Sequence, residues 1–309
     1  MKVVITGAAG LIGQNLIARL MSRADIDIVA IDKHPSNTAR LHELHPDITV
    51  IEADLAEGGA WERSFEGSDI LVLGHAQIGG LLPEEFERNN VAATRLVLDA
   101  ARKSGCRHII HLSSSVVNSA VRDFYTESKK AQERLVVESG LPHTVLRPTL
   151  MFGWFDRKHL GWLARFMKAS PLFPVPGNGN FLRQPLYAGD FCNIIIACMN
   201  RAPAGNAYNI SGLEKIPYID LIRGLREAIG ARTLVVRIPY PLFSLALRVY
   251  ALFDRNPPFT VKQLEALVTP DIFEVIDWPG IFAVHATPLR EALHETFHHP
   301  VYSRVTLDF

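Results

Sequence analysis

The stretch Lys2–Gly13, KVVITGAAGLIG, decides the fold of this chain. Its first part, Lys2–Thr6, is a short β-branched run that is typical of a buried strand. Glycines follow at Gly7, Gly10 and Gly13, and an apolar pattern of helical period begins at Leu11. Glycines at a strand-to-helix turn let the backbone approach a phosphate, and the helix N-terminus offers amide donors. The spacing is GxxGxxG rather than GxGxxG, so a purely structural turn stays open at this point.

The N-terminal half of the chain repeats this alternation of short apolar runs and helical segments. Such strand–helix–strand units build parallel sheets with right-handed connections. Helical periodicity is present in Leu11–Ser22, Pro83–Ser104 and Tyr125–Ser139. The six expected strands are Lys2–Thr6, Ile26–Ile31, Ile48–Ala53, Ile70–Leu73, His108–Ser113 and His143–Arg147. The pattern predicts an α/β fold: a Rossmann-type doubly wound parallel sheet with a smaller C-terminal substrate lobe.

The composition changes after the pair Arg147-Pro148. We expect residues 1–153 to form the Rossmann domain, with residues 186–212 returning to it, and residues 154–185 and 213–309 to form the substrate lobe. Pro171–Asn180, PLFPVPGNGN, has too many prolines and glycines for a regular element and predicts a loop that covers a ligand. Pro239–Phe253 is an apolar stretch with one internal charge, Arg248. It predicts a buried helix or, alternatively, a face that binds a hydrophobic molecule.

The charge balance and the cysteines restrict the classes of function. The 309 residues carry 32 Lys plus Arg and 32 Asp plus Glu, so no net field attracts nucleic acid or an anionic membrane. Three cysteines without a CxxC pair do not form a closed disulfide framework. The N-terminus lacks the pattern of a signal peptide, and no apolar run reaches the roughly 18 residues of a spanning helix. We therefore expect a cytoplasmic protein with no membrane span and no nucleic-acid partner.

An acidic residue downstream of the glycines supports a dinucleotide site. Asp32 ends the second strand, 19 residues beyond Gly13, where a carboxylate can accept both hydroxyls of an adenosine ribose. Such a carboxylate repels a 2′-phosphate, so the sequence favours NAD over NADP. Lys33 and His34 could neutralise that phosphate, which keeps NADP as the alternative. Asp54, after the third strand, is either a contact to the adenine edge or a polar loop residue.

A tyrosine and a lysine lie four residues apart, at Tyr125 and Lys129, on one face of an expected helix. A nearby cation favours the phenolate, so such a tyrosine could exchange a proton with a substrate hydroxyl. Three serines, Ser113–Ser115, end the fifth strand at the sheet edge where ligands bind. A hydroxyl there could orient a carbonyl beside Tyr125.

Taken in order, these motifs resemble the extended short-chain dehydrogenase/reductase superfamily, in particular its NAD-dependent epimerases and dehydratases. The resemblance covers nearly the whole chain. Its motifs are TGAAGLIG (Thr6–Gly13), Asp32, Asp54-Leu55, NVAAT (Asn90–Thr94), HLSSS (His111–Ser115), YTESK (Tyr125–Lys129) and LRPTLMFG (Leu146–Gly153).

The resemblance implies roles for individual residues. Tyr125 would be the acid/base, Lys129 would bind the nicotinamide ribose and lower the tyrosine pKa, and Ser114 would orient the carbonyl, with Ser115 as its competitor and a substrate contact. Arg183, in a segment similar to the family's RxxxHVxD, would contact the diphosphate of a sugar nucleotide. The residues expected around the cofactor are Gly7, Ala9, Gly10, Leu11, Ile12, Gly13, Asp32, Asp54, Leu55, Asn90, Tyr125, Lys129 and Pro148.

Two departures from the family pattern bear on the substrate. Ser114 and Tyr125 are eleven positions apart, whereas sugar-nucleotide epimerases usually carry a longer loop there. No acidic residue follows the serines directly, which disfavours dehydration.

His75 occupies a position where the family often has alanine, and is either near the substrate or a packed loop histidine. His294 and His298 share a helix face without an acidic or cysteine partner, so no metal is expected.

The favoured hypothesis is an NAD-dependent nucleotide-sugar epimerase that works by hydride transfer to and from nicotinamide, with Tyr125 as acid/base. The first alternative is a net NAD(P)-dependent dehydrogenase or reductase of a sugar or of a hydrophobic alcohol, 3β-hydroxysteroid-like or polyprenyl-linked. The second is a non-catalytic NAD-binding subunit. By resemblance, a homodimer is expected through the Pro83–Ser104 and Tyr125–Ser139 helices.

Overall fold

A computed structural model describes residues 1–120, 122–254, 260–269 and 272–308. Its centre is a seven-stranded parallel sheet in the order β11-β6-β5-β4-β1-β2-β3. These strands are β1 (Lys2–Thr6), β2 (Asp27–Asp32), β3 (Thr49–Glu52), β4 (Ile70–Leu73), β5 (His108–Leu112), β6 (His143–Pro148) and β11 (Ala207–Ile210). The strand order reverses beside β1, as in doubly wound sheets, so the predicted α/β class is confirmed. The seventh strand, β11, pairs with β6.

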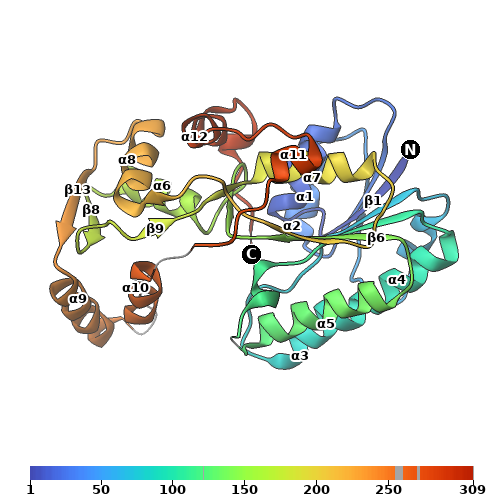
Figure 1. Cartoon of the computed structure of the whole chain (residues 1–309), viewed down its shortest axis with the longest axis horizontal. Helices are drawn as coiled ribbons and strands as arrows, with labels where there is room; N and C mark the ends of the chain where they lie inside the picture. The colour runs from blue at the N-terminus through green and yellow to red at the C-terminus, as the bar shows by residue number, and fades with distance from the viewer. Residues whose placement is uncertain (121, 255–259, 270–271, 309) are drawn as a thin grey trace.

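Helices cover both faces of this sheet (Figure 1). On one face, α1 (Leu11–Leu20), α2 (Pro35–Leu44) and α7 (Ala188–Met199) pack their apolar side chains on the strands. On the other face, α4 (Ala93–Ser104), α5 (Phe124–Glu138) and a short 3-10 helix (Ala60–Phe65) do the same. The strands are apolar because both of their faces are buried.

The expected helix Pro83–Ser104 consists of three pieces. These are α3 (Pro83–Phe86), a π-helical turn (Glu87–Ala92) and α4, and they follow one another without a break. Asn90 lies in the π-helical turn, a local irregularity that is frequent near functional sites.

The smaller lobe lies beyond the carboxyl ends of the strands, on the left of Figure 1. Its helices are α6 (Leu160–Ala169), α8 (Tyr218–Ala228), α9 (Tyr240–Phe253) and α10 (Val261–Val268). Its strands are β8 (Leu172–Pro176), β9 (Leu182–Arg183), β12 (Ile216–Pro217) and β13 (Leu234–Ile238). Between the lobes, β7 (Met151–Phe152) pairs with β10 (Leu186–Tyr187), and near the C-terminus α11 (Trp278–Phe282) precedes α12 (Leu289–His298).

Two expectations about the smaller lobe are wrong. Pro171–Asn180 is not all loop, because β8 runs through it and pairs in parallel with β13. The ribbon has only these two strands, so prolines whose missing amide faces outward are tolerated. The helix in Pro239–Phe253 is not buried either, since Ser244 is the one buried residue of α9.

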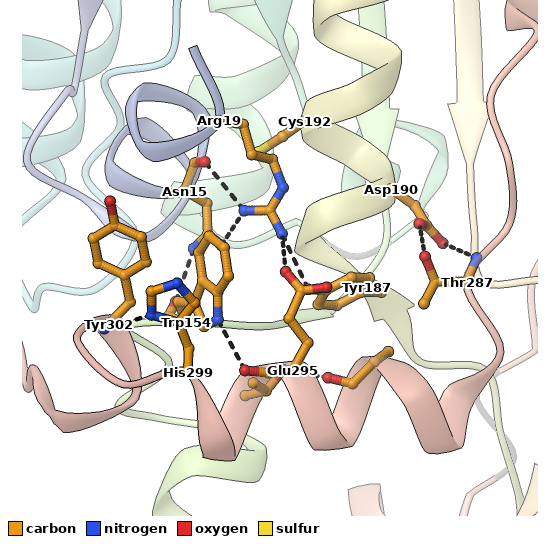
Figure 2. A network of polar contacts seen from close by, with 12 residues as sticks. Asn15, Arg19, Trp154, Tyr187, Asp190, Cys192, Thr287, Glu295, His299 and Tyr302 are labelled. Carbon is orange, nitrogen blue, oxygen red and sulfur yellow. Dashed lines mark hydrogen bonds and ion pairs between the residues drawn. The ribbon is translucent and has the colours of Figure 1, made fainter. Parts of the chain in front are cut away.

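A polar and aromatic network fastens α12 to the Rossmann domain (Figure 2). The Arg19 guanidinium of α1 lies 4.1 Å from the centre of the Trp154 ring and forms an ion pair of 2.9 Å with Glu295 of α12. It also donates to the Tyr187 hydroxyl, at 3.0 Å. Each of these residues comes from a different element, so the network joins α1, α12 and the β7 and β10 segments.

Candidate active site

A cleft of about 700 Å³ opens at the carboxyl ends of the strands on either side of β1. This is the edge where ligands bind in doubly wound sheets. Most of the predicted site residues line it: Gly7, Ala9, Gly10, Leu11, Ile12, Gly13, Asp32, Asp54, Leu55, Ser114, Ser115, Tyr125, Lys129 and Pro148. The structure therefore brings the glycine turn, the acidic residues and the Tyr-Lys pair to one cavity.

The glycine turn has no room for side chains at two of its three glycines. Gly7 has a φ of +67°, and a Cβ there would lie 2.7 Å from the Gly74 oxygen. A Cβ on Gly13 would lie 2.4 Å from the Ala8 oxygen, because α1 packs closely on the strand-to-helix turn. Gly10 differs, since its Cβ would lie 3.4 Å from the Gly7 oxygen and meet nothing nearer. Gly10 caps the N-terminus of α1, whose first residues line the cleft.

Asp32 lines the cleft at the end of β2 and also holds the local backbone in place. One carboxylate oxygen accepts the Ala9 amide at 3.0 Å and the other accepts the His34 amide at 3.1 Å. Each carboxylate oxygen has a further lone pair, so the group keeps the capacity to accept ribose hydroxyls. Lys33 lines the same region, and its ammonium donates to Asn89 Oδ1 at 2.8 Å.

Asp54 faces a cation of its own chain. Its carboxylate pairs with Arg88 at 2.7 Å, and Arg88 also pairs with Glu57 at 2.6 Å. The pKa of Asp54 is lowered, because the Ala56 amide and the Arg88 guanidinium outweigh the opposing effect of partial burial. Asp54 is therefore an ionised carboxylate at the rim of the cleft.

Tyr125 is hydrogen-bonded to the side chain of Ser114. Ser114 comes from the loop after β5, and Tyr125 lies in the first turn of α5. Burial raises the pKa of Tyr125, and the hydrogen bond with Ser114 offsets part of that rise. The phenol is thus protonated at neutral pH, and the two hydroxyls lie together at the cleft.

Lys129 is fully buried beside this pair, with 1% of its surface exposed. Its ammonium donates to the Leu112 carbonyl at 3.0 Å and to Gln132 Oε1. Burial lowers its pKa to about 7, although Glu133 favours the charged form. The hydrogen bond with Ser114 lowers the pKa of Tyr125, and a lowering by Lys129 stays a prediction.

Sequence reasoning missed an acidic residue, Glu133, that contacts the cleft-lining Ser113. The Glu133 carboxylate accepts the Ser113 hydroxyl at 2.5 Å and two donors of the Arg147 guanidinium. These contacts lower the pKa of Glu133 in spite of its burial. Glu133 lies four residues after Lys129 and so on the same face of α5, which is the signal that could have identified it.

Two predicted site residues lie outside the lining of the cleft. Asn90 binds the backbone of Gln77 through both of its amide atoms, at 2.6 and 3.1 Å, and donates to the Ser128 hydroxyl at 2.9 Å. It therefore positions the Gln77 loop, which does line the cleft. Arg183 donates instead to the carbonyls of Leu267 and Thr269 near the end of α10. Its guanidinium is engaged by the smaller lobe.

His75 lines the cleft, and its ring is also packed against side chains of its own chain. Its ring is buried between the hydroxyls of Thr6 and Thr94, at 2.9 and 3.2 Å, and burial lowers its pKa to about 3. His294 and His298 stack on each other, and His298 contacts the Ala228 carbonyl at 2.5 Å. Within residues 1–120, 122–254, 260–269 and 272–308, no group of three His, Cys, Asp or Glu could hold a metal ion.

Beyond the Ser114–Tyr125 pair, the lining of the cleft is mainly apolar. The loop after Ser115 contributes Val116, the segment after β6 contributes Leu150 and Met151, and the smaller lobe contributes Phe273. His159 is the titratable group among these neighbours, and burial lowers its pKa. These apolar side chains are the part of the lining that suits an apolar ligand.

The comparisons with known proteins agree with this architecture. Residues 3–211 match the model of the NAD dependent epimerase/dehydratase family. The chain is 25% identical to ceramide reductase of Caulobacter vibrioides, over 77% of this chain and 74% of that protein. It is 26% identical to N-acetyl-alpha-D-glucosaminyl-diphospho-ditrans,octacis-undecaprenol 4-epimerase of Escherichia coli O157:H7, over 79% and 77%. UDP-glucose 4-epimerase of Thermotoga maritima superposes with a TM-score of 0.76 at 18% identity, covering 96% of this chain and 97% of that one.

The chain thus belongs to the NAD dependent epimerase/dehydratase family. It is an enzyme, its cofactor is NAD, and it is an extended short-chain dehydrogenase/reductase, as the sequence predicted. The residues present fit that cofactor, because Gly7 and Gly13 allow the tight turn and the close packing of α1, Gly10 leaves the N-terminus of α1 open to a pyrophosphate, and a carboxylate ends β2.

Proposed function

We propose that this enzyme transfers a hydride between NAD(H) and a secondary alcohol or ketone of a hydrophobic molecule, with Tyr125 as the proton donor and acceptor. One observation carries the proposal: the Ser114–Tyr125 hydroxyl pair lies in the cofactor cleft, next to an apolar lining. This corresponds to the first alternative from the sequence rather than to the nucleotide-sugar epimerase favoured there.

The chain's own residues supply the proton and the orientation. NAD supplies the chemistry of hydride acceptance and donation at nicotinamide C4. In the direction of reduction, Ser114 donates a hydrogen bond to the ketone oxygen and Tyr125 transfers its phenolic proton to that oxygen as the alcohol forms. The raised pKa of Tyr125 keeps this proton available at neutral pH. In the direction of oxidation the same proton returns to Tyr125.

We assign the cofactor-facing roles to residues that line the cleft. The backbone of Gly7 to Gly13 would accommodate the pyrophosphate and Asp32 the adenosine ribose. Lys129 would bind the nicotinamide ribose, because it lines the same cleft as Ser114 and Tyr125 and its ammonium donates to the Leu112 carbonyl at the end of β5. Leu55, Ala9, Leu11, Ile12 and Pro148 would supply apolar contacts around the rings.

Two observations favour a hydrophobic substrate over a nucleotide sugar. Arg183, which the resemblance assigned to a diphosphate, donates to carbonyls of its own chain instead. In addition, ceramide reductase takes its name from a lipid, and the 4-epimerase of Escherichia coli O157:H7 takes its name from a sugar diphosphate that is attached to undecaprenol and not to a nucleotide. A long apolar substituent would contact Val116, Leu150 and Phe273.

Epimerisation of a sugar is the second candidate, and its specific support is the 26% identity to the undecaprenol-linked sugar epimerase. The same Tyr125 proton serves an epimerase, which oxidises the substrate and reduces it again on the other face. An epimerase regenerates its cofactor in each cycle, whereas an oxidoreductase changes the NADH concentration stoichiometrically.

The test is a substrate panel followed at the absorbance of NADH. The enzyme is mixed with NADH and a 3-ketosteroid or a long-chain ketone, and separately with NAD⁺ and either UDP-glucose or a polyprenyl-linked sugar. We expect one NADH oxidised for each hydrophobic ketone reduced, and no change with UDP-glucose. Conversion of a sugar to its epimer without any change in NADH would replace the proposal with the second candidate.

We also propose the expected organisation of the molecule. Residues 1–153 and 186–212 form the NAD-binding domain, and residues 154–185 and 213–309 form the substrate lobe. The surfaces of α4 and α5 pair two copies as a homodimer. The three cysteines, Cys106, Cys192 and Cys198, are free and buried, which supports a reducing compartment such as the cytoplasm.

A further inference from the structure

The helix α9 exposes an apolar surface that neither the Rossmann domain nor the cleft uses. It lies at the outer end of the smaller lobe, next to α10 and away from the main sheet (Figure 1). Leu242, Leu245, Val249 and Leu252 follow at intervals of three and four residues, so they form one stripe along the helix. Their exposed fractions are 58%, 58%, 46% and 81%, and Phe253 at the end of the stripe is 86% exposed.

A soluble surface rarely keeps so many large apolar side chains together. Single exposed leucines are ordinary, but here they occupy one face of one helix. The preceding strand β13 adds Leu234 and Val236, which are 61% and 40% exposed. The pattern indicates a surface that is covered when the protein works.

Most of the charges around this stripe are positive, and the acidic residue at its end, Asp254, accepts a hydrogen bond from the Tyr250 hydroxyl at 3.2 Å. Residues 230–253 contain Arg232, Arg237 and Arg248 but no Asp or Glu. All three arginines are exposed, and none forms an ion pair with a residue that the structure describes. An apolar stripe flanked by cations complements the headgroups and acyl chains of an anionic bilayer. The whole chain is neutral, so this positive charge is local.

The length of the helix restricts how it meets a membrane. Its 14 residues span about 21 Å, which is shorter than the hydrocarbon core of a bilayer. None of the described helices is long and apolar enough to cross a membrane. A helix of this kind lies in the plane of the interface with its apolar stripe in the outer part of the bilayer.

We propose that the α9 surface, formed by Leu242, Leu245, Val249, Leu252 and Phe253 with the arginines Arg232, Arg237 and Arg248, binds the surface of an anionic lipid bilayer. The occupant is a membrane rather than a second copy of this chain, because two such surfaces would place like charges against each other. This inference does not depend on which reaction the cleft performs.

The test is co-sedimentation of the full chain with phospholipid vesicles. We expect binding to vesicles rich in phosphatidylglycerol and at least tenfold weaker binding to pure phosphatidylcholine. The double variant Leu252→Ser/Phe253→Ser should weaken binding at least tenfold, since it removes the two most exposed side chains of the stripe. The matched control is Leu81→Ser, because Leu81 is 91% exposed but lies between β4 and α3, far along the chain from α9.

A second measurement separates loss of contact from loss of folding. Leu252→Cys, labelled with a polarity-sensitive dye, should show a blue shift on anionic vesicles, whereas Leu81→Cys should not. The proposal is wrong if the wild type does not sediment with phosphatidylglycerol vesicles, or if the double variant sediments equally well. It is also wrong if light scattering shows that the double variant converts a dimer to a monomer, since a second copy would then cover the surface.

Discussion

Tyr125 is the residue on which the proposed chemistry depends most. Its hydroxyl shares a hydrogen bond with Ser114, and burial raises its pKa. Tyr125→Phe removes the proton that the ketone oxygen must receive and keeps the ring, so kcat should fall by about 10²- to 10⁴-fold. Titration with NADH should give an unchanged Kd. Tyr208→Phe is the matched control, because the Tyr208 hydroxyl binds Asn206 outside the cleft. An active Tyr125→Phe enzyme would exclude this role.

The choice between Ser114 and Ser115 can be tested in the same way. Both line the cleft, but the pKa of Tyr125 responds to a hydrogen bond from Ser114. Ser114→Ala should therefore lower kcat by about 10²-fold, as for the loss of a donor to a developing oxyanion. Ser115→Ala should lower it much less. The reverse order in steady-state kinetics would assign the carbonyl-orienting role to Ser115.

Lys129 should reduce stability while it supports function. Burial lowers its pKa from 10.5 to about 7, so the unfolded chain binds more protons than the folded one between these values. The unfolding free energy of the wild type therefore rises with pH across this window. Lys129→Met should be more stable by about 1–2 kcal/mol near neutral pH. It should also be inactive.

The control for that prediction is its pH dependence. The stability difference between Lys129→Met and the wild type should narrow as the pH rises from 7 toward 10, because the wild-type amine loses its proton in the unfolded chain as well. Urea denaturation at both pH values measures it. A difference that stays constant would show that burial does not perturb the amine.

At the scale of elements, substitutions at the three glycines between β1 and α1 should affect either folding or cofactor binding, depending on the glycine. Gly13→Ala and Gly7→Ala each place a Cβ within 2.7 Å of the backbone, which should cost about 1–3 kcal/mol of stability. Gly10→Ala meets its nearest atom at 3.4 Å, so the fold should tolerate it. Its methyl group would lie at the N-terminus of α1, where NADH binding should weaken. Thermal melting and NADH titration distinguish these effects, and an equal loss of stability in all three variants would contradict the account.

The sequence predicted the elements whose periodicity is strong and local. β1 and β4 have the bounds that were expected, and α5 differs from its prediction by one residue at each end. β8 was missed because proline density argues against a strand unless the partner is known, and β13 lies about 60 residues away. The burial of α9 was predicted wrongly because an apolar composition does not specify what covers a helix.

The candidate site was predictable where motif and topology agree. Asp32, Ser114 and Tyr125 all follow strand ends or begin helices at one sheet edge, so their convergence follows from the fold. Arg183 and Asn90 do not line the cleft, and their predicted roles stay predictions. Their contacts, the Leu267 carbonyl and the Gln77 backbone, depend on tertiary packing that no local pattern encodes.

At the scale of the whole molecule, two lobes meet at one cleft and α12 fastens the C-terminal end to α1. The apolar lining of the cleft and the exposed stripe of α9 have one property in common: both suit contact with a hydrophobic molecule. An enzyme with this arrangement would take its substrate from a lipid phase and reduce or oxidise it in the cleft. This account predicts a net redox change in a lipid-soluble product.

The measurement that tests this claim most directly is isotope transfer from NADH that is deuterated at nicotinamide C4. The enzyme is incubated with this cofactor and a pool of hydrophobic ketones, and the lipid-soluble products are examined by mass spectrometry. We expect a product alcohol that carries one deuterium with the wild type, and at least about 100-fold less of it with Tyr125→Phe. No labelled lipid, together with epimerisation of a nucleotide sugar by the same preparation, would contradict it.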